Sequence, residues 1–246
     1  MFMPPTIGGS PDVGRYVVLF EDFLAAGASG SVADLGTTPS GETFVMDGAD
    51  AGSHTATVVA AGGLGGIFNI ATSGTHASVL ALTSDDGTPG KQLPFDCSQG
   101  PIMQCRLKVV SNDITTNQAL YIGIASEHEA TADDVTKNAW IKFPASMDVV
   151  LESDDDSTDS DDKDPSLAIV KDTWYEFRVD ASTPTDVKFY YRTTLGGAWT
   201  EITDSTTTFS IGASADGVQP YIRVDDSGSA VASVYVDYVA MWQERE

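Results

Sequence analysis

Alternation of apolar and polar residues is the strongest pattern along this chain. In residues 102–110 apolar side chains occupy every second position and polar ones the positions between: Met103, Cys105, Leu107 and Val109 against Gln104, Arg106 and Lys108. This alternation is typical of an antiparallel strand with one buried and one solvated face. Residues 119–125 are apolar on both faces, so we expect them at the centre of a sheet.

Two more alternating segments lie in the last third of the chain. Residues 174–192 hold two short runs around a proline-containing turn, which predicts a β-hairpin with Tyr175, Phe177 and Val179 facing inward. Residues 231–242 form a long run that predicts a closing strand.

Shorter apolar runs, each bounded by Gly, Asp or Ser, predict further strands at 16–23, 43–46, 55–60, 66–71, 77–83, 140–143, 147–151, 199–202, 208–211 and 220–224. At most one short helix is expected, after Ser126, where Ser-Glu-His-Glu matches a capping box. No internal repeat is visible, which disfavours a propeller or a β-helix. The fold expected is an all-β sandwich of two antiparallel sheets.

The length and the distribution of Pro and Gly suggest how the chain is divided. Residues 1–14 hold three prolines and three glycines without periodicity, and predict an extended N-terminal arm. Residues 15–246 are short enough to form a single sandwich domain.

The charge balance excludes some partners. Thirty-six acidic residues against 13 basic ones give a formal net charge of -23. Such a chain would repel nucleic acid and anionic membrane surfaces, so neither partner is expected. No segment approaches the ~18 apolar residues of a membrane span.

The two cysteines do not make a disulfide framework in a domain of this length. Cys105 lies on the inward side of its predicted strand, as a buried thiol would. Cys97 lies in a turn eight residues earlier, and a bridge between the two remains an alternative.

The order of these elements resembles the concanavalin A-like, or laminin G-like, jelly-roll sandwich. Within that superfamily the opening Phe20-Glu21-Asp22-Phe23 and the ending Asp237-Tyr238-Val239-Ala240-Met241-Trp242-Gln243-Glu244-Arg245 are similar to the ends of jelly-roll structural proteins of tailed bacteriophages. Phe20 to Phe23 departs from that family's opening by having Glu21.

This resemblance implies a non-enzymatic virion component that decorates or cements the capsid exterior after assembly in the host cytoplasm. The partner would be the major capsid protein, and the chain would form a symmetric oligomer, plausibly a trimer. The arm would lie across a neighbour and bury its apolar residues, Phe2, Pro4, Pro5 and Ile7.

The acidic run 152–164 is the most extreme local composition. Carboxylate oxygens are calcium ligands, and Asp154, Asp156, Asp159 and Asp161 are the candidates, although the spacing is not that of an EF-hand. A solvent-facing hairpin loop without metal is the alternative.

Exposed aromatic rings can stack on sugars, and Trp140, Tyr190 and Trp199 lie near turns or on the outward side of their predicted strands. A second function is therefore a carbohydrate-binding, lectin-like adsorption module, with or without calcium. The same rings could instead be half-buried between the sheets.

Catalytic patterns are weak. Glu127 and Glu129 flank His128 and are the nearest approach to the carboxylate pair of a glycosidase, but they follow a strand and do not lie on one. The three histidines lack metal-ligand spacing, and no nucleophile elbow or phosphate loop is present. We expect no enzyme.

Overall fold

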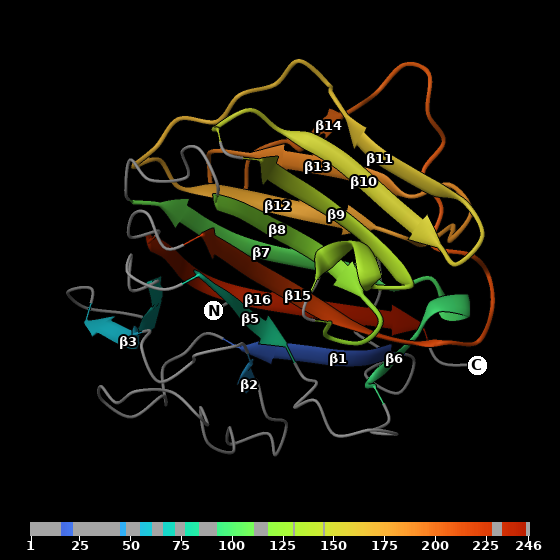
Figure 1. Ribbon diagram of the computed structural model, residues 1–246, viewed down its shortest axis with the longest axis horizontal. Coiled ribbons are helices and arrows are strands. Elements are labelled where there is room, and N and C mark those ends of the chain that lie inside the picture. Colours follow the sequence, from blue (N-terminus) through green and yellow to red (C-terminus); the bar gives the residue numbers. More distant parts are fainter. Residues whose placement is uncertain are drawn as a thin grey trace.

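The computed structural model is a sandwich of two antiparallel sheets (Figure 1). The structure describes the strands at 16–21, 45–47, 55–60, 66–71 and 77–83, and residues 93–110, 118–129, 131–144, 146–227 and 233–244. The expected arm at 1–14 lies outside these described residues.

Sheet A holds the predicted hairpin and the closing strand. Its order is β14 (Thr200–Ile202), β13 (Lys188–Arg192), β12 (Tyr175–Asp180), β7 (Ile102–Val109), β16 (Ser233–Glu244), β4 (Gly66–Ala71) and β3 (Thr55–Ala60). β1 (Tyr16–Glu21) pairs with the C-terminal half of β16, and β4 pairs with its N-terminal half. The closing strand β16 therefore pairs with the first described strand, β1, as well as with β4 and β7.

Sheet B holds the apolar segment 119–125 at its centre, as predicted. Its order is β11 (Asp159–Lys163), β10 (Val150–Asp155), β9 (Lys137–Pro144), β8 (Gln118–Ala125), β15 (Gly217–Ser227), β5 (Ala77–Thr83) and β2 (Val45–Asp47). The short β6 (Phe95–Asp96) pairs with the start of β15. β8 lies between β9 and β15, and both of its faces are covered: Leu120, Ile122 and Ile124 pack in the main core, and Tyr121 and Ala125 in a second cluster on the other side.

The core lies between the two sheets, where the predicted inward positions of β7 and β12 are confirmed. Met103, Cys105 and Leu107 are fully buried, as are Phe177 and Val179. Each large apolar side chain removed from water in this way stabilises the fold by roughly 1.5–3 kcal/mol. The aromatic rings of Phe143 from sheet B and Phe177 from sheet A meet edge to face, with centroids 5.8 Å apart.

A glycine allows the central strands of sheet B to approach closely. Gly123 is paired with Trp140 on β9, and a Cβ at position 123 would lie 2.1 Å from the carbonyl oxygen of Ala139. Because this contact is with backbone, no other residue fits without moving the strand.

Two predictions about secondary structure are wrong. The helix expected after Ser126 does not form, because the Ser126 hydroxyl accepts a hydrogen bond from the backbone N–H of Lys137 and so joins the two ends of a loop. Within the described residues the only helical turns are η2 (Cys97–Gln99) and η3 (Ala132–Asp134). Residues 208–211 form no strand, since Phe209 makes a single bridge to Val187. None of the described helices is long and apolar enough to cross a membrane.

The disulfide alternative is also wrong, because both thiols are free and buried. The Cys97 thiol donates to the carbonyl oxygens of Ile211 and Gly212, and burial raises its pKa to about 12. Burial raises the pKa of Cys105 as well. Such thiols pack as small apolar groups and are not reactive.

Candidate functional site: the outer face of sheet A

The outer face of sheet A gathers most of the tryptophans and a large share of the cations of an acidic chain. We call it the aromatic–cationic face. It holds three of the four tryptophans and five of the 13 basic residues, namely Trp174, Trp199, Trp242, Arg106, Lys108, Arg178, Lys188 and Arg192. Alternation places these side chains outward because their neighbours on β7, β12 and β13 fill the core.

A buried polar network forms the centre of this face. The Glu176 carboxylate accepts two hydrogen bonds from Arg192, at 2.5 and 2.9 Å, and further bonds from Gln104 and the Tyr238 hydroxyl. Arg178 donates to the Gln104 side-chain carbonyl at 3.0 Å. Glu176, Gln104 and Tyr238 are all nearly inaccessible to solvent, although they lie on the outward side of the sheet.

This bonding argues for a structural role for Glu176, because four donors occupy its two oxygens. A carboxylate saturated in this way has little capacity left to move a proton. Burial and the neighbouring Glu176 raise the pKa of Tyr238, so this phenol stays protonated at neutral pH. The network thus holds the face rigid without offering an acid–base pair.

Two clusters of aromatic rings and cations flank the network. The guanidinium carbons of Arg178 and Arg192 lie 4.3 and 4.2 Å from the ring centre of Trp199. On the other side, Arg106 and Lys108 lie 4.7 and 5.2 Å from the Trp174 ring. Contacts of this kind contribute about 0.5–1 kcal/mol each where they are exposed, and they orient the rings.

A bulge in β16 brings the aromatic residues of that strand to this face. Pairing with β7 shifts between Val236 and Tyr238, so Tyr238 and Trp242 face outward while Val239 and Met241 face the core. Asp237, the extra residue, bonds Arg106 at 2.5 Å. The sequence carries a signal for this bulge, since the core valines of the strand change from even to odd positions between Val236 and Val239.

The outer face of sheet B carries a second cluster, but a loop covers it. Ala132 and Val135 of the loop between β8 and β9 pack over Tyr121, Trp140 and Tyr221 and make a small separate core there. Two hydrogen bonds hold the loop. The Gln219 side-chain amide donates to the carbonyl oxygen of Ser126 at 2.7 Å, and His128 is bonded to the Tyr221 hydroxyl at 2.6 Å.

Charged groups beneath and beside this loop are paired. Arg223 is 1% exposed and bonds both Asp225 and the carbonyl oxygen of Glu129. Lys142 bridges Glu152 at 3.0 Å and Asp162 at 2.8 Å. Burial raises the pKa of the Glu152 carboxyl, although the nearby Lys142 opposes that shift. Among the described residues of this side, the aromatic rings are covered and these charged groups are paired.

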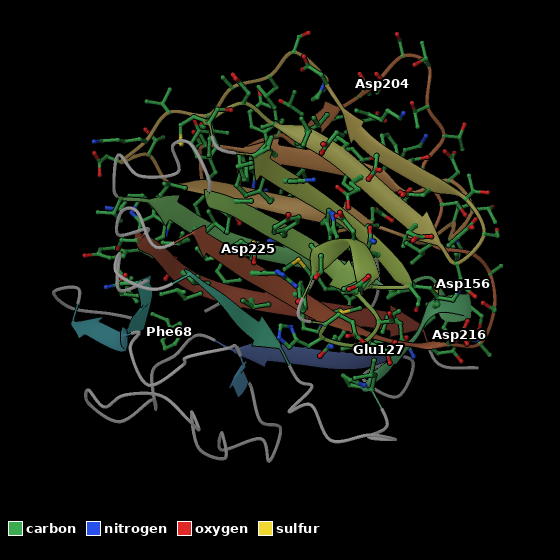
Figure 2. The ribbon with its side chains drawn as sticks, in the orientation of Figure 1. Phe68, Glu127, Asp156, Asp204, Asp216 and Asp225 are labelled. Carbon is green, nitrogen blue, oxygen red and sulfur yellow. The ribbon has the colours of Figure 1, made fainter. Side chains whose placement is uncertain are left out.

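The other predicted residues do not meet at one place. Glu127 is exposed on the loop after β8, and the backbone carbonyl oxygen of Glu129 accepts a hydrogen bond from Arg223. Asp156 lies at the tip of the β10–β11 hairpin (Figure 2). The acidic run is an ordinary two-stranded hairpin at the edge of sheet B. Asp154 accepts a hydrogen bond from the backbone of Asp156. Within the described part of the chain no group of three or more potential metal ligands is brought together.

The three candidate glycan contacts lie on different sheets. Trp140 is fully buried under the loop 126–136, so this ring cannot stack on a sugar. Tyr190 and Trp199 are half-buried on the aromatic–cationic face, where Tyr190 is paired across the sheet with Arg178 and Glu201. Sequence reasoning missed Trp174, Trp242 and the cations beside them, because strand order decides which outward residues become neighbours.

No model of a protein family matches the sequence, and no curated protein is similar to it. Solved structures with a similar fold do exist. A protein of unknown function from Shewanella oneidensis MR-1 has a TM-score of 0.65 at 13% identity, over 94% of this chain and 87% of that one.

Two further structures resemble the chain at 10% identity. The alginate lyase Aly36B has a TM-score of 0.51 over 92% of this chain and 96% of that one, and peanut lectin has a TM-score of 0.50 over 92% and 97%. The expected fold is confirmed: the chain has the concanavalin A-like jelly-roll sandwich of the legume lectins.

Proposed function

We propose that this chain is a non-enzymatic structural protein of a bacteriophage virion, which decorates or cements the capsid exterior. One observation supports the proposal most directly. The opening and ending segments that resemble phage jelly-roll proteins are hydrogen-bonded neighbours, with Phe20 paired to Ala240 and Glu21 paired to Val239. The resemblance therefore falls on one structural unit of the fold, where β1 meets β16.

The proposed mode of attachment uses charge and area. A chain with a net charge of -23 would dock on a basic capsid surface formed by the major capsid protein. The arm at 1–14 would bury Phe2, Pro4, Pro5 and Ile7 against a neighbour. A symmetric trimer would place three arms around one capsid axis.

Immunogold electron microscopy of phage particles tests this location, with an antibody raised against the purified chain. Label spread over the heads is the expected result. Label confined to tail tips would indicate a role in adsorption and contradict the proposed decoration of the head. Particles without label would contradict the proposal that the chain is a virion protein. Particles treated with pre-immune serum are the control.

A second candidate function, carbohydrate binding, is favoured by the aromatic–cationic face. Its rings are half-buried and held by arginines, and the fold is that of a lectin. Sugars bind such faces through ring stacking and hydrogen bonds from fixed donors. Because the candidate calcium residues lie on the other sheet, we expect binding to survive a chelator.

A glycan array tests this function, followed by titration calorimetry with any glycan that binds. Trp199→Ala should weaken binding about tenfold, a loss of ~1.4 kcal/mol. Lys163→Ala, on the edge strand β11 of the other sheet, is the control and should bind as the wild type does. An array without any signal would leave carbohydrate binding without support.

A further inference from the structure

A cavity of about 410 Å³ opens at one end of the sandwich, beside the turn between β13 and β14. Its wall comes from the 167–168 segment, from Tyr175 and Tyr191, and from the turn around Thr194. This volume lies within the roughly 300–1,000 Å³ range of small-ligand pockets. The cavity borders the aromatic–cationic face at Arg192, whereas Tyr191 in its wall points to the opposite side of β13 from Tyr190.

The charges around the cavity exclude charged ligands. Among the described residues, Arg192 is the only charged one in its wall, and its guanidinium is bonded to both oxygens of Glu176 and to the carbonyl oxygen of Gly197 at 2.9 Å. An anion would compete with the Glu176 carboxylate for Arg192, and a cation would find no carboxylate among the described wall residues. The ligand that fits is neutral.

The polar and apolar groups of the wall specify the ligand further. The rings of Tyr175 and Tyr191 lie with centroids 6.4 Å apart. Within the described residues, nothing is hydrogen-bonded to the hydroxyls of Tyr191, Thr193 or Thr194, which leaves them available to a ligand. A neutral molecule that offers both apolar C–H faces and many hydroxyl groups is a sugar.

Two exposed apolar residues lie close in sequence to the cavity wall. Val170 and Leu195 are 65% and 63% exposed and are the large apolar residues that the described chain leaves most open to solvent. Both lie within two residues of the cavity wall, Val170 after Ala168 and Leu195 next to Thr194.

We propose that this cavity binds one uncharged, hexose-sized sugar residue, between the tyrosine rings and the threonine hydroxyls of the β13–β14 turn. This inference rests on the second proposed function, carbohydrate binding. It places the sugar-recognising pocket at the end of the sandwich and leaves the aromatic–cationic face to support longer glycans.

Saturation-transfer NMR tests the inference with the full chain and 10 mM methyl glycosides of glucose, galactose, mannose and N-acetylglucosamine, and with methyl glucuronide as a charged comparison. We expect transfer to at least one neutral glycoside and none to the glucuronide. Thr194→Trp, which fills the cavity from its exposed rim, should abolish that transfer. Tyr191→Ala should do the same if its circular dichroism stays that of the wild type.

Thr208→Trp, at an exposed threonine outside the described cavity wall, is the matched control for Thr194→Trp and should keep full transfer. Transfer that persists in Thr194→Trp and disappears in Trp199→Ala would overturn the cavity site while leaving carbohydrate binding in place. Equal transfer to the glucuronide would overturn the neutral ligand. No transfer to any glycoside by the wild type would overturn both the cavity site and carbohydrate binding.

Discussion

Glu176 shows at the scale of a single residue how an outward position becomes buried and structural. Its place in the alternation of β12 is a solvated one, yet it is 2% exposed because Arg192, Gln104 and Tyr238 close around it. A buried carboxylate is stable only when it is fully hydrogen-bonded and paired with a cation. The rigidity of the aromatic–cationic face therefore depends on this one group.

Glu176→Ala should lower the free energy of unfolding by about 2–4 kcal/mol, because it leaves Arg192 without its counter-charge and the Tyr238 hydroxyl without its acceptor. Urea unfolding followed by circular dichroism measures the change. Glu176→Gln keeps one acceptor oxygen and replaces the other by an NH2 donor, so it loses the charge and part of the hydrogen bonding, and a loss smaller than that of the alanine variant is expected. A change below 0.5 kcal/mol for the alanine variant, the size of an ordinary surface substitution, would contradict the structural role.

The β10–β11 hairpin shows at the scale of an element why the acidic run folds without an ion. Asp155 accepts from the backbone N–H groups of Ser157 and Thr158, at 3.1 and 2.8 Å, and from the Ser157 hydroxyl at 2.6 Å. These bonds close the turn in the way that aspartates usually stabilise tight turns. The carboxylates along β11 then keep the exposed edge of sheet B from pairing with another chain.

Asp155→Ala should cost about 0.5–1.5 kcal/mol at pH 7, through the lost hydrogen bonds of the turn. The Ser157 hydroxyl and the backbone donors lower the pKa of Asp155 from its ordinary value of 3.8. The unfolded state therefore takes up this proton at a higher pH than the native state does. The stabilisation is complete above the ordinary value and disappears as the pH falls through the lowered one.

Urea unfolding of both proteins between pH 7 and pH 2.5 should show the difference shrinking below about pH 4. Asp156→Asn removes a neighbouring charge without removing a hydrogen bond of the turn, and serves as the control. A difference that stays constant over this range would contradict the assignment of the stabilisation to the ionised Asp155.

At the scale of the whole molecule, the closing strand joins the two ends of the chain. β16 pairs with β7 on one edge, while β1 and β4 share its other edge. Residues 16–21 thus belong to the sandwich, whereas the proposed role of residues 1–14 is outside it. These two parts can be separated by truncation.

Deletion of residues 1–14 should leave the circular dichroism spectrum and the melting temperature unchanged and abolish sedimentation with purified capsids. Deletion of residues 1–21 should also lower the melting temperature, because the edge of β16 from Val239 to Glu244 loses its partner. Capsid binding that survives the shorter deletion would remove the arm from the proposal.

Capsid attachment should also weaken as salt rises, since it is proposed to join an acidic body to a basic surface. We expect less co-sedimentation at 0.5 M than at 0.05 M NaCl, because the screening length falls roughly threefold over that range. Binding that is insensitive to salt would indicate an attachment made by apolar area alone.

Local pattern was sufficient to predict the strands whose residues alternate. β7 and β12 obey that rule because one face of each packs into the core. β11 was missed because an edge strand of aspartates buries almost nothing and so carries no apolar signal. The helix after Ser126 was wrong because a contact eleven residues away, with Lys137, competes with the local cap.

The sequence by itself determined the all-β class, the inward residues of the central strands and the acidity of the surface, since each depends on composition or on neighbours two residues apart. Tertiary structure alone decided the sites. It buried Trp140 beneath a loop, brought Trp199 to Arg178 and Arg192, and opened a cavity between Tyr175 and Tyr191. These contacts depend on which strands and loops lie beside each other, and that order follows from packing two sheets around one core.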